Sequence, residues 1–277
     1  MSGRHRPEGG GGMTGRVDLH TLAEGPPGAP LAVLVHGLED SWESWQALSR
    51  RLAGGWRVVA LDLPWRPGND YRWRRRTPSA WLADGLDLLD TVPDAVVAHS
   101  FGANATLELL CGGDIPPWRA TALICPLYRP PDVAITWTVF DTSRRTFDQH
   151  MRDGLLARLG RRATRMDADL LDKMTATAID RVGPAGFLAV FEQFSASATL
   201  ALARAAMPTL ILAGGADPTL SRSAATKLAG AMPEATVAFR DCYDHFCHVR
   251  HAGEVAAKIE DFVAGVPAAQ MRSEALT

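Results

Sequence analysis

The chain has 277 residues, of which 47% are hydrophobic and 22% charged, and its formal net charge is −2. This length suits one large domain or two small ones with a substantial buried core. The near-neutral charge argues against nucleic acid or an anionic membrane as the main partner, and no apolar run approaches the roughly 18 residues that span a bilayer. The four cysteines are too few for a disulfide framework and are typical of reduced thiols in a cytoplasmic protein.

The two ends of the chain are expected to lie outside the fold. Residues 1–15 include four consecutive glycines and lack the apolar stretch of a secretory signal. We expect them to form a disordered lead, and we expect residues 267–277 to form a flexible tail.

After the lead, short apolar segments alternate with segments of helical spacing. The expected strands occupy residues 31–35, 56–61, 95–98 and 121–125, and the expected helices occupy residues 45–52, 79–89 and 103–110. Thr77 and Pro78 suit the N-cap and the first position of the second helix. Strands that are apolar throughout and separated by helices indicate a parallel sheet covered on both faces, and hence a doubly wound α/β architecture.

The alternation stops over residues 133–203. This block has no convincing strand, and its helical stretches cover residues 151–159, 168–179 and 185–194. The alternation then resumes with strands at 209–213 and 236–239 and helices at 221–232 and 253–264. We therefore expect one α/β domain, built from residues 16–132 and 204–266, into which a helical lid of residues 133–203 is inserted.

A serine stands where the third expected strand meets its helix, in Ala95-Val-Val-Ala-His-Ser-Phe-Gly-Ala103. Small residues at Ala98 and Gly102 suit a sharp, strained turn that exposes the hydroxyl of Ser100, because bulky flanks would collide with the neighbouring strand and helix. Such a turn also directs backbone N–H groups of the helix N-terminus at a developing negative charge. By itself, the same pattern fits a serine that merely caps a helix.

A nucleophilic serine needs a base, and the base needs an acid that orients it. Asp217 follows the expected strand at 209–213 and His245 follows the last one, so both are expected at the sheet edge where α/β proteins place their sites. The turn after the first strand would aim the N–H of Leu38 at the same place, and with the N–H of Phe101 it would form an oxyanion hole.

Five stretches resemble the α/β-hydrolase superfamily, in the branch with a helical lid after the sixth strand, and the resemblance covers residues 17–265. They are Val35-His-Gly-Leu38, Leu61-Asp-Leu-Pro64, Ala98-His-Ser-Phe-Gly102, Gly214-Gly-Ala-Asp217 and Asp244-His-Phe-Cys-His-Val249. The resemblance implies a triad of Ser100, Asp217 and His245, in the family's chain order. It also implies an acyl-enzyme, an oxyanion held by the N–H groups of Leu38 and Phe101, and no cofactor.

The chain departs from the family at three positions. Ala98 replaces the first glycine of the serine motif, Asp244 replaces the glycine before the histidine, and Arg250 stands where a glutamate is common. The departures at Asp244 and Arg250 concern the base, because a bulkier Asp244 could hold His245 differently or supply a second carboxylate, and His248 is the fallback base.

The leading hypothesis is hydrolysis or transfer of an acyl group from a small-molecule ester or thioester, with no nucleic acid or membrane as partner. The same fold also hosts amide hydrolysis, carbon–carbon bond hydrolysis, lactone-forming cyclisation and cofactor-free rearrangement. The Ala/Arg-rich composition suggests a bacterial source, and by analogy natural-product metabolism. A hypothesis from another class is a small-molecule binding protein without catalysis.

Three other features carry weaker expectations. Trp42, Trp45 and Trp137 line an apolar acyl pocket or belong to the core. The run Arg72-Trp-Arg-Arg-Arg76 is a solvated loop, or it meets a phosphate of a carrier-bound or coenzyme A-bound substrate. Five residues crowd near the C-terminus in a spacing that matches no common zinc pattern, so no metal is expected; they are Cys242, His245, Cys247, His248 and His251.

Overall fold

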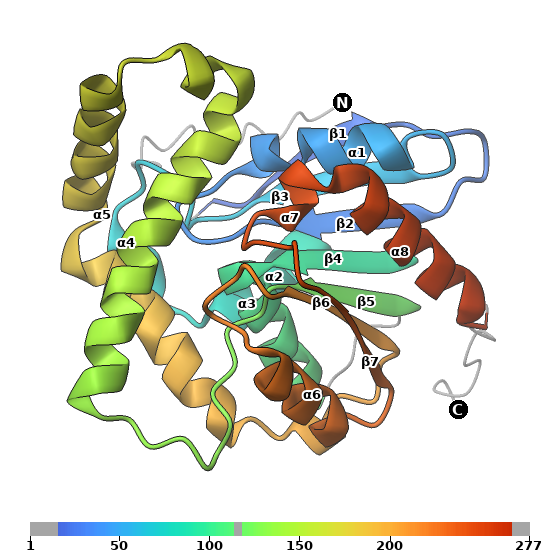
Figure 1. The fold of residues 1–277 in the computed structure, drawn as a ribbon. Helices are drawn as coiled ribbons and strands as arrows, with labels where there is room; N and C mark the ends of the chain where they lie inside the picture. The colour runs from blue at the N-terminus through green and yellow to red at the C-terminus, as the bar shows by residue number, and fades with distance from the viewer. Residues whose placement is uncertain (1–15, 114–117, 268–277) are drawn as a thin grey trace, which may run out of the picture.

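The computed structural model describes residues 16–113 and 118–267, and a seven-stranded sheet runs through its centre (Figure 1). The strand order is β1-β3-β2-β4-β5-β6-β7, with β1 antiparallel to β3 and all other neighbours parallel. The strands are β1 (Asp18–Ala23), β2 (Leu31–Val35), β3 (Arg57–Asp62), β4 (Ala95–His99), β5 (Ala120–Ile124), β6 (Thr209–Gly214) and β7 (Ala235–Arg240). The predicted doubly wound, mostly parallel α/β sheet is confirmed.

The strand β1 is the one that the sequence pattern did not predict. Its residues alternate between partly buried and exposed positions, whereas every residue of β2, β4, β5 and β6 is buried. An edge strand of this kind lacks the continuous apolar run that marks a strand covered on both faces.

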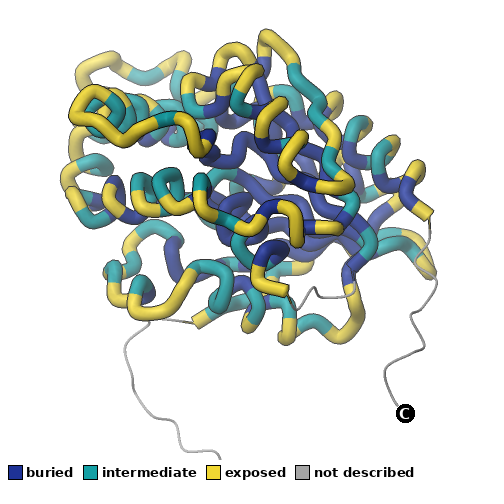
Figure 2. The backbone as a smooth tube through the Cα atoms, turned by 90° about the horizontal axis from the view of Figure 1, so that it is seen from below, coloured by how far each residue is buried: buried dark blue, intermediate teal, exposed yellow. Residues whose placement is uncertain are grey.

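Helices cover both faces of the sheet and enclose two separate apolar cores. One core joins the sheet to α2 (Pro78–Leu86), α3 (Ser100–Cys111) and α6 (Arg222–Ala231), and the other joins it to α1 (Gln46–Leu52) and α8 (Ala252–Gly265). The short α7 (Cys247–Arg250) precedes α8. Thr77 caps α2 as predicted, because its hydroxyl accepts from the N–H of Ala80 at 3.2 Å. Figure 2 shows the buried strands beneath more exposed helices.

Between β5 and β6 the chain forms two long helices, α4 (Trp137–Leu159) and α5 (Ala168–Ala196), which pack together at one end of the sheet (Figure 1). A kink at Gly183, where φ is 58°, precedes Pro184 and divides α5 into the two halves that the sequence predicted as separate helices. Phe147, Met151 and Phe187 belong to a third apolar cluster between these helices.

In the described chain this helical pair follows β5 and precedes β6. Short 3-10 helices complete the fold: η1 (Trp42–Trp45), η2 (Tyr71–Arg75), η3 (Gly160–Arg165), η4 (Ser197–Thr199) and η5 (Leu202–Arg204). The predicted lead at residues 1–15, and all but the first residue of the predicted tail at 267–277, lie outside the described residues. Among the helices that the structure describes, none combines the length and apolar character needed to cross a bilayer.

Candidate active site

Ser100 lies on a strained turn between β4 and α3. Its φ of 52° is in the left-handed region, which residues with a β-carbon rarely adopt. A β-carbon on Gly102 would overlap the carbonyl oxygen of His36, so the helix can approach β2 this closely only with glycine there. The methyl group of Ala98 is fully buried within β4, so the sheet accommodates it where the family more often has glycine.

Ser100 is brought together with His245 and Asp217, which come from loops after β7 and β6. The Ser100 hydroxyl lies 2.8 Å from His245 Nε2, and His245 Nδ1 lies 2.9 Å from Asp217 Oδ2. Since a carboxylate only accepts, His245 Nδ1 carries the proton and Nε2 is free to accept one from Ser100. Burial opposes the charge on Asp217, but the nearby His245 and His150 outweigh it and hold the pKa of that carboxyl well below its usual range.

A buried histidine fixes the turn that carries Leu38. His36 Nε2 accepts from the N–H of Leu63 at 2.9 Å, which leaves Nδ1 as the nitrogen that donates to the Gly37 carbonyl at 2.8 Å. Burial lowers the pKa of His36 to about 4, so the ring is neutral and both of these bonds hold at neutral pH. A β-carbon on Gly37 would lie 3.3 Å from the β-carbon of Ser100, so the turn passes directly beside the nucleophile.

The N–H groups expected to bind an oxyanion are free for that role. Leu38 N–H donates to no acceptor among the described residues, and Phe101 N–H belongs to the first turn of α3, where helical partners are missing. Leu38 also lines the same cavity as Ser100.

A cavity of about 330 Å³ opens over Ser100 and His245, roofed by α4 and α5. Its apolar lining includes Val139, Phe147, Met151, Phe187, Val190, Phe191 and Phe194. The α5 members recur at positions i, i+3, i+4 and i+7, so one face of this helix points into the cavity. This spacing is visible in the sequence, but the sequence does not show that this face of α5 points into the cavity.

The sequence reasoning missed His150, which α4 carries into the site. Its ring stacks on His245 with the centroids 3.9 Å apart and an interplanar angle of 11°. Its Nε2 lies 3.6 Å from Asp217 Oδ1. The local sequence around His150 is ordinary helix, so only its position in space connects it to the triad.

The two departures near the histidine compensate each other. Arg250 Nη1 lies 2.6 Å from Asp244 Oδ2, and the other oxygen of Asp244 accepts from the N–H of Phe246 at 3.0 Å. The carboxylate of Asp244 therefore binds residues of its own loop, and the carboxylate that contacts His245 Nδ1 is that of Asp217.

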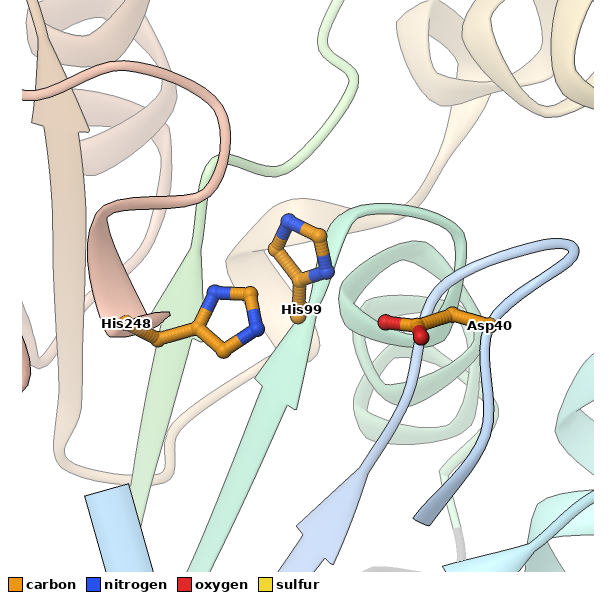
Figure 3. Close-up of side chains that lie close together, drawn as sticks. All are labelled: Asp40, His99 and His248. Atoms are coloured by element: carbon orange, nitrogen blue, oxygen red, sulfur yellow. The ribbon is translucent and has the colours of Figure 1, made fainter. Parts of the chain in front are cut away.

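The fallback base, His248, does not line the cavity over Ser100, and its ring lies against His99 with the centroids 4.3 Å apart. It is fully buried beside His99 and Asp40, and the three offer ligand-type atoms within 4.8 Å of one another (Figure 3). His99 Nε2 donates to the His245 carbonyl at 2.8 Å. The other ring nitrogen, Nδ1, is therefore unprotonated, and it accepts no hydrogen bond from the described residues. Burial raises the pKa of Asp40 and lowers that of His248 to about 3.

Histidine and aspartate are residue types that bind transition metals. The same arrangement also fits neutral, buried histidines beside a carboxyl group that water hardly reaches. The C-terminal cysteines and histidines do not gather: Cys242 is exposed, whereas His245 joins Asp217 and His248 joins His99. All four cysteines are free.

Two tryptophans expected at the substrate pocket lie elsewhere. Trp42 stacks on His20 of the edge strand, with ring centroids 4.4 Å apart. Trp137 begins α4 and is 83% exposed, whereas Thr138 and Val139 of the same helical turn line the cavity. Neither lines the cavity over Ser100, and Trp45 is a core residue packed on His248. The structure therefore brings neither Trp42 nor Trp137 to this cavity, and Trp42 instead packs against the core that joins the sheet to α1 and α8.

The basic run lies at a second cavity of about 330 Å³, between η2, α3 and α5. Three of its arginines are engaged in ion pairs: Arg72 with Asp70 at 3.2 Å, Arg74 with Glu192 of α5 at 2.7 Å and Arg76 with Asp84 of α2 at 2.6 Å. Arg75 lines the same cavity, is exposed, and makes no ion pair with the described residues.

Comparison with known proteins yields one family and several relatives. The model of the alpha/beta hydrolase family matches residues 32–258. The magnesium-chelatase 30 kDa subunit of Rhodobacter capsulatus is 27% identical over 91% of this chain and 93% of its own length. Epoxide hydrolase B of Mycobacterium tuberculosis is 49% identical, but over only 31% of this chain and 26% of that protein.

Solved structures share the fold at low identity. The bromoperoxidase of Bacillus anthracis aligns with a TM-score of 0.66 at 19% identity, covering 90% of this chain and 96% of that one. An N-acyl homoserine lactone degrading enzyme aligns with a TM-score of 0.65 at 16% identity, covering 90% and 97%. At these identities the similarity concerns the architecture alone.

Proposed function

The chain belongs to the alpha/beta hydrolase family, and we propose that it is a serine hydrolase that cleaves small-molecule esters or thioesters of apolar acyl groups. One observation carries the proposal: the hydroxyl of Ser100, held at a strained turn, lies 2.8 Å from a histidine nitrogen that is free to take its proton. His245 is in turn oriented by the buried carboxylate of Asp217 at 2.9 Å. This is the arrangement that activates a serine.

In the proposed mechanism, Ser100 attacks the acyl carbon while His245 Nε2 takes the hydroxyl proton. The negative charge moves to the carbonyl oxygen, where the N–H groups of Leu38 and Phe101 stabilise it. The C–O or C–S bond then breaks as His245 returns the proton to the leaving group, leaving an acyl-serine ester. Water, deprotonated by His245, hydrolyses that ester and restores Ser100.

Serine at this position favours acyl carbon over the saturated carbon of an epoxide. Attack of Ser100 on a saturated carbon would form an ether, which water does not cleave, so the enzyme would stop after one turnover. Attack on an acyl carbon forms an ester, which the same base and water can hydrolyse. The short match to epoxide hydrolase B therefore does not carry that activity to this chain.

The cavity supports an apolar acyl group, because the face of α5 that lines it consists of three phenylalanines and Val190. The helix α4 lines it with apolar side chains and with the hydroxyl groups of Thr138, Thr142, Ser143 and Thr146. We propose that residues 133–203 act as a lid, since these helices roof the cavity over Ser100. Carrier-bound or coenzyme A-bound substrates remain part of the proposal, with Arg75 as the available phosphate contact. The four free cysteines suit a reducing, cytoplasmic location.

A second candidate function rests on the full-length relative named as a magnesium-chelatase subunit. In that case the protein acts as a subunit that binds a ligand or a partner protein on behalf of another enzyme, and Ser100, His245 and Asp217 contribute little to its function. The two candidates differ in one measurable property, because only a hydrolase needs an activated Ser100.

Labelling with a fluorophosphonate, followed by mass spectrometry of the modified peptide, tests the proposal. We expect labelling at Ser100 in the wild type, none in Ser100→Ala, and a loss of about a thousandfold in rate in Asp217→Asn and His245→Ala. The Cys242→Ala variant, changed at an exposed position, serves as the control. Folded wild type that resists labelling would contradict the hydrolase and favour the binding protein.

A further inference from the structure

His150, a side chain of the helical insertion, lies against both the base and the acid of the triad. It comes from the middle of α4, and its ring lies nearly parallel to His245 at 3.9 Å between centroids. Its side chain is only 12% exposed, and its Nε2 faces Asp217 Oδ1 at 3.6 Å. Nothing in the proposed mechanism requires a second histidine here.

The stacked ring has two physical consequences for His245. It covers one face of the imidazole, which restricts rotation away from Ser100 and keeps water from the bond between His245 and Asp217. Asp217 Oδ1 already accepts from the N–H of Thr219 at 2.9 Å and from its hydroxyl. The Nε2 of His150 is buried and makes no hydrogen bond with the described residues, so a small shift of α4 would let it reach this carboxylate.

The charge of His150 decides whether this stacking is stable. Burial, and then the nearby His245, lower the pKa of His150, while Asp217 and Asp153 act in the opposite direction. At neutral pH the ring is therefore neutral, and it can rest on His245 even when that ring becomes positively charged during the reaction. A protonated His150 would place two like charges 3.9 Å apart.

We infer that His150 is a positioning residue that holds His245 against Asp217. Because α4 carries His150, the activation of Ser100 then depends on the position of α4 over the site. Figure 1 shows α4 passing along the end of the sheet, in contact with α5. When α4 moves away, the stacking partner leaves with it. This inference rests on the proposed triad.

The experiment compares fluorophosphonate labelling rates of four proteins between about pH 5 and 9, the range in which histidines titrate. They are the wild type, His150→Ala, His150→Phe and the control Gln149→Ala, whose side chain is exposed on the same helix. We expect His150→Ala to label about tenfold to a hundredfold more slowly, with a shifted midpoint of the pH profile, because the base is no longer held in place. His150→Phe, which keeps a stacked ring, should recover most of the rate, and Gln149→Ala should match the wild type.

A second readout does not depend on labelling. The proton shared by His245 and Asp217 gives a downfield signal in the proton NMR spectrum, and its exchange with water reports whether that bond is covered. Exchange should be faster in His150→Ala than in the wild type or Gln149→Ala. Thermal unfolding of each variant checks that the fold is retained, and His150→Phe preserves the apolar packing of α4 if alanine does not.

The outcomes separate this inference from the proposed function. Wild-type protein that is not labelled contradicts the hydrolase, whereas the NMR comparison still tests the covering of the bond by His150. His150→Ala with the wild-type rate, pH midpoint and exchange would overturn the positioning role. His150→Phe as slow as His150→Ala would overturn the role of stacking.

Discussion

Gly102 packs so closely against His36 that a β-carbon on the glycine would overlap the histidine's carbonyl oxygen. This contact sets the depth at which α3 begins and therefore the height of Ser100 above the sheet. We expect Gly102→Ala to lower the free energy of unfolding by about 2 kcal/mol, because backbone must move to relieve the overlap, and to abolish labelling of Ser100. Urea unfolding and fluorophosphonate labelling measure the two effects.

The matched control is Gly230→Ala in α6, where an added β-carbon would meet no atom within 4 Å. There, alanine should leave stability unchanged or raise it by up to about 1 kcal/mol, since it favours helix. Equal losses in the two variants would contradict the role given to Gly102.

His36 makes the protein sensitive to acid. In the unfolded chain its pKa is near 6.5, whereas in the folded protein burial lowers the pKa to about 4. Between these values unfolding takes up a proton, so stability rises with pH and is lost as pH falls from 6.5 towards 4. The part due to His36 amounts to about 3 kcal/mol.

Urea unfolding at a series of pH values tests this dependence. In His36→Gln the free energy of unfolding should be lower at pH 7, because the bond from Leu63 is disturbed, but it should fall less steeply with acid. The expected difference in slope is about 1.4 kcal/mol per pH unit in that window, which corresponds to one proton. Parallel curves for the two proteins would show that His36 does not titrate as described.

The face of α5 that lines the cavity should set the length of the acyl group. Val190 lies on this face, whereas Leu188 is 39% exposed on the same helix. We expect Val190→Trp to shift the preference towards shorter acyl chains by filling part of the space over Ser100. Turnover of p-nitrophenyl esters from acetate to dodecanoate measures the shift, and Leu188→Trp should retain the wild-type profile.

Arg75 should matter only for substrates that carry phosphate. It borders the second cavity without an ion pair among the described residues, whereas Arg74 is held by Glu192 at 2.7 Å. Arg75→Ala should raise the KM for a coenzyme A thioester several-fold, since a charged contact to phosphate is lost, and leave the p-nitrophenyl ester of the same acyl group unaffected. Equal effects on both substrates, or none on either, would remove the phosphate contact from the proposal.

Local patterns in the sequence were sufficient for most of the fold. Runs of mainly apolar residues predicted six of the seven described strands, including the partly buried edge strand β7, and the break in alternation predicted the helical block that became α4 and α5. These signals are local, because burial on both faces of a sheet demands apolar residues at every position. The half-exposed β1 has no such signature and was missed.

Ser100, Asp217 and His245 could be named from sequence because each lies at the end of a strand or in the loop that follows it, and the carboxyl ends of parallel strands meet at one edge. The pairing of Asp244 with Arg250 and the placement of Trp137 could not be named in this way. They depend on the conformation of a loop and on the orientation of the end of a helix, and neither is set by the position of a strand in the sequence.

The α/β sheet, the serine at its strained turn and the chain order of the three residues that meet there can thus be inferred from sequence patterns. The surroundings of these residues cannot: His150 stacks on the base, and His99 lies close to Asp40 and His248. These contacts join residues that are far apart along the chain. Asp217 and His150 lie on segments separated by the whole of α5, and packing of side chains across the insertion, not local periodicity, brings them within 3.6 Å.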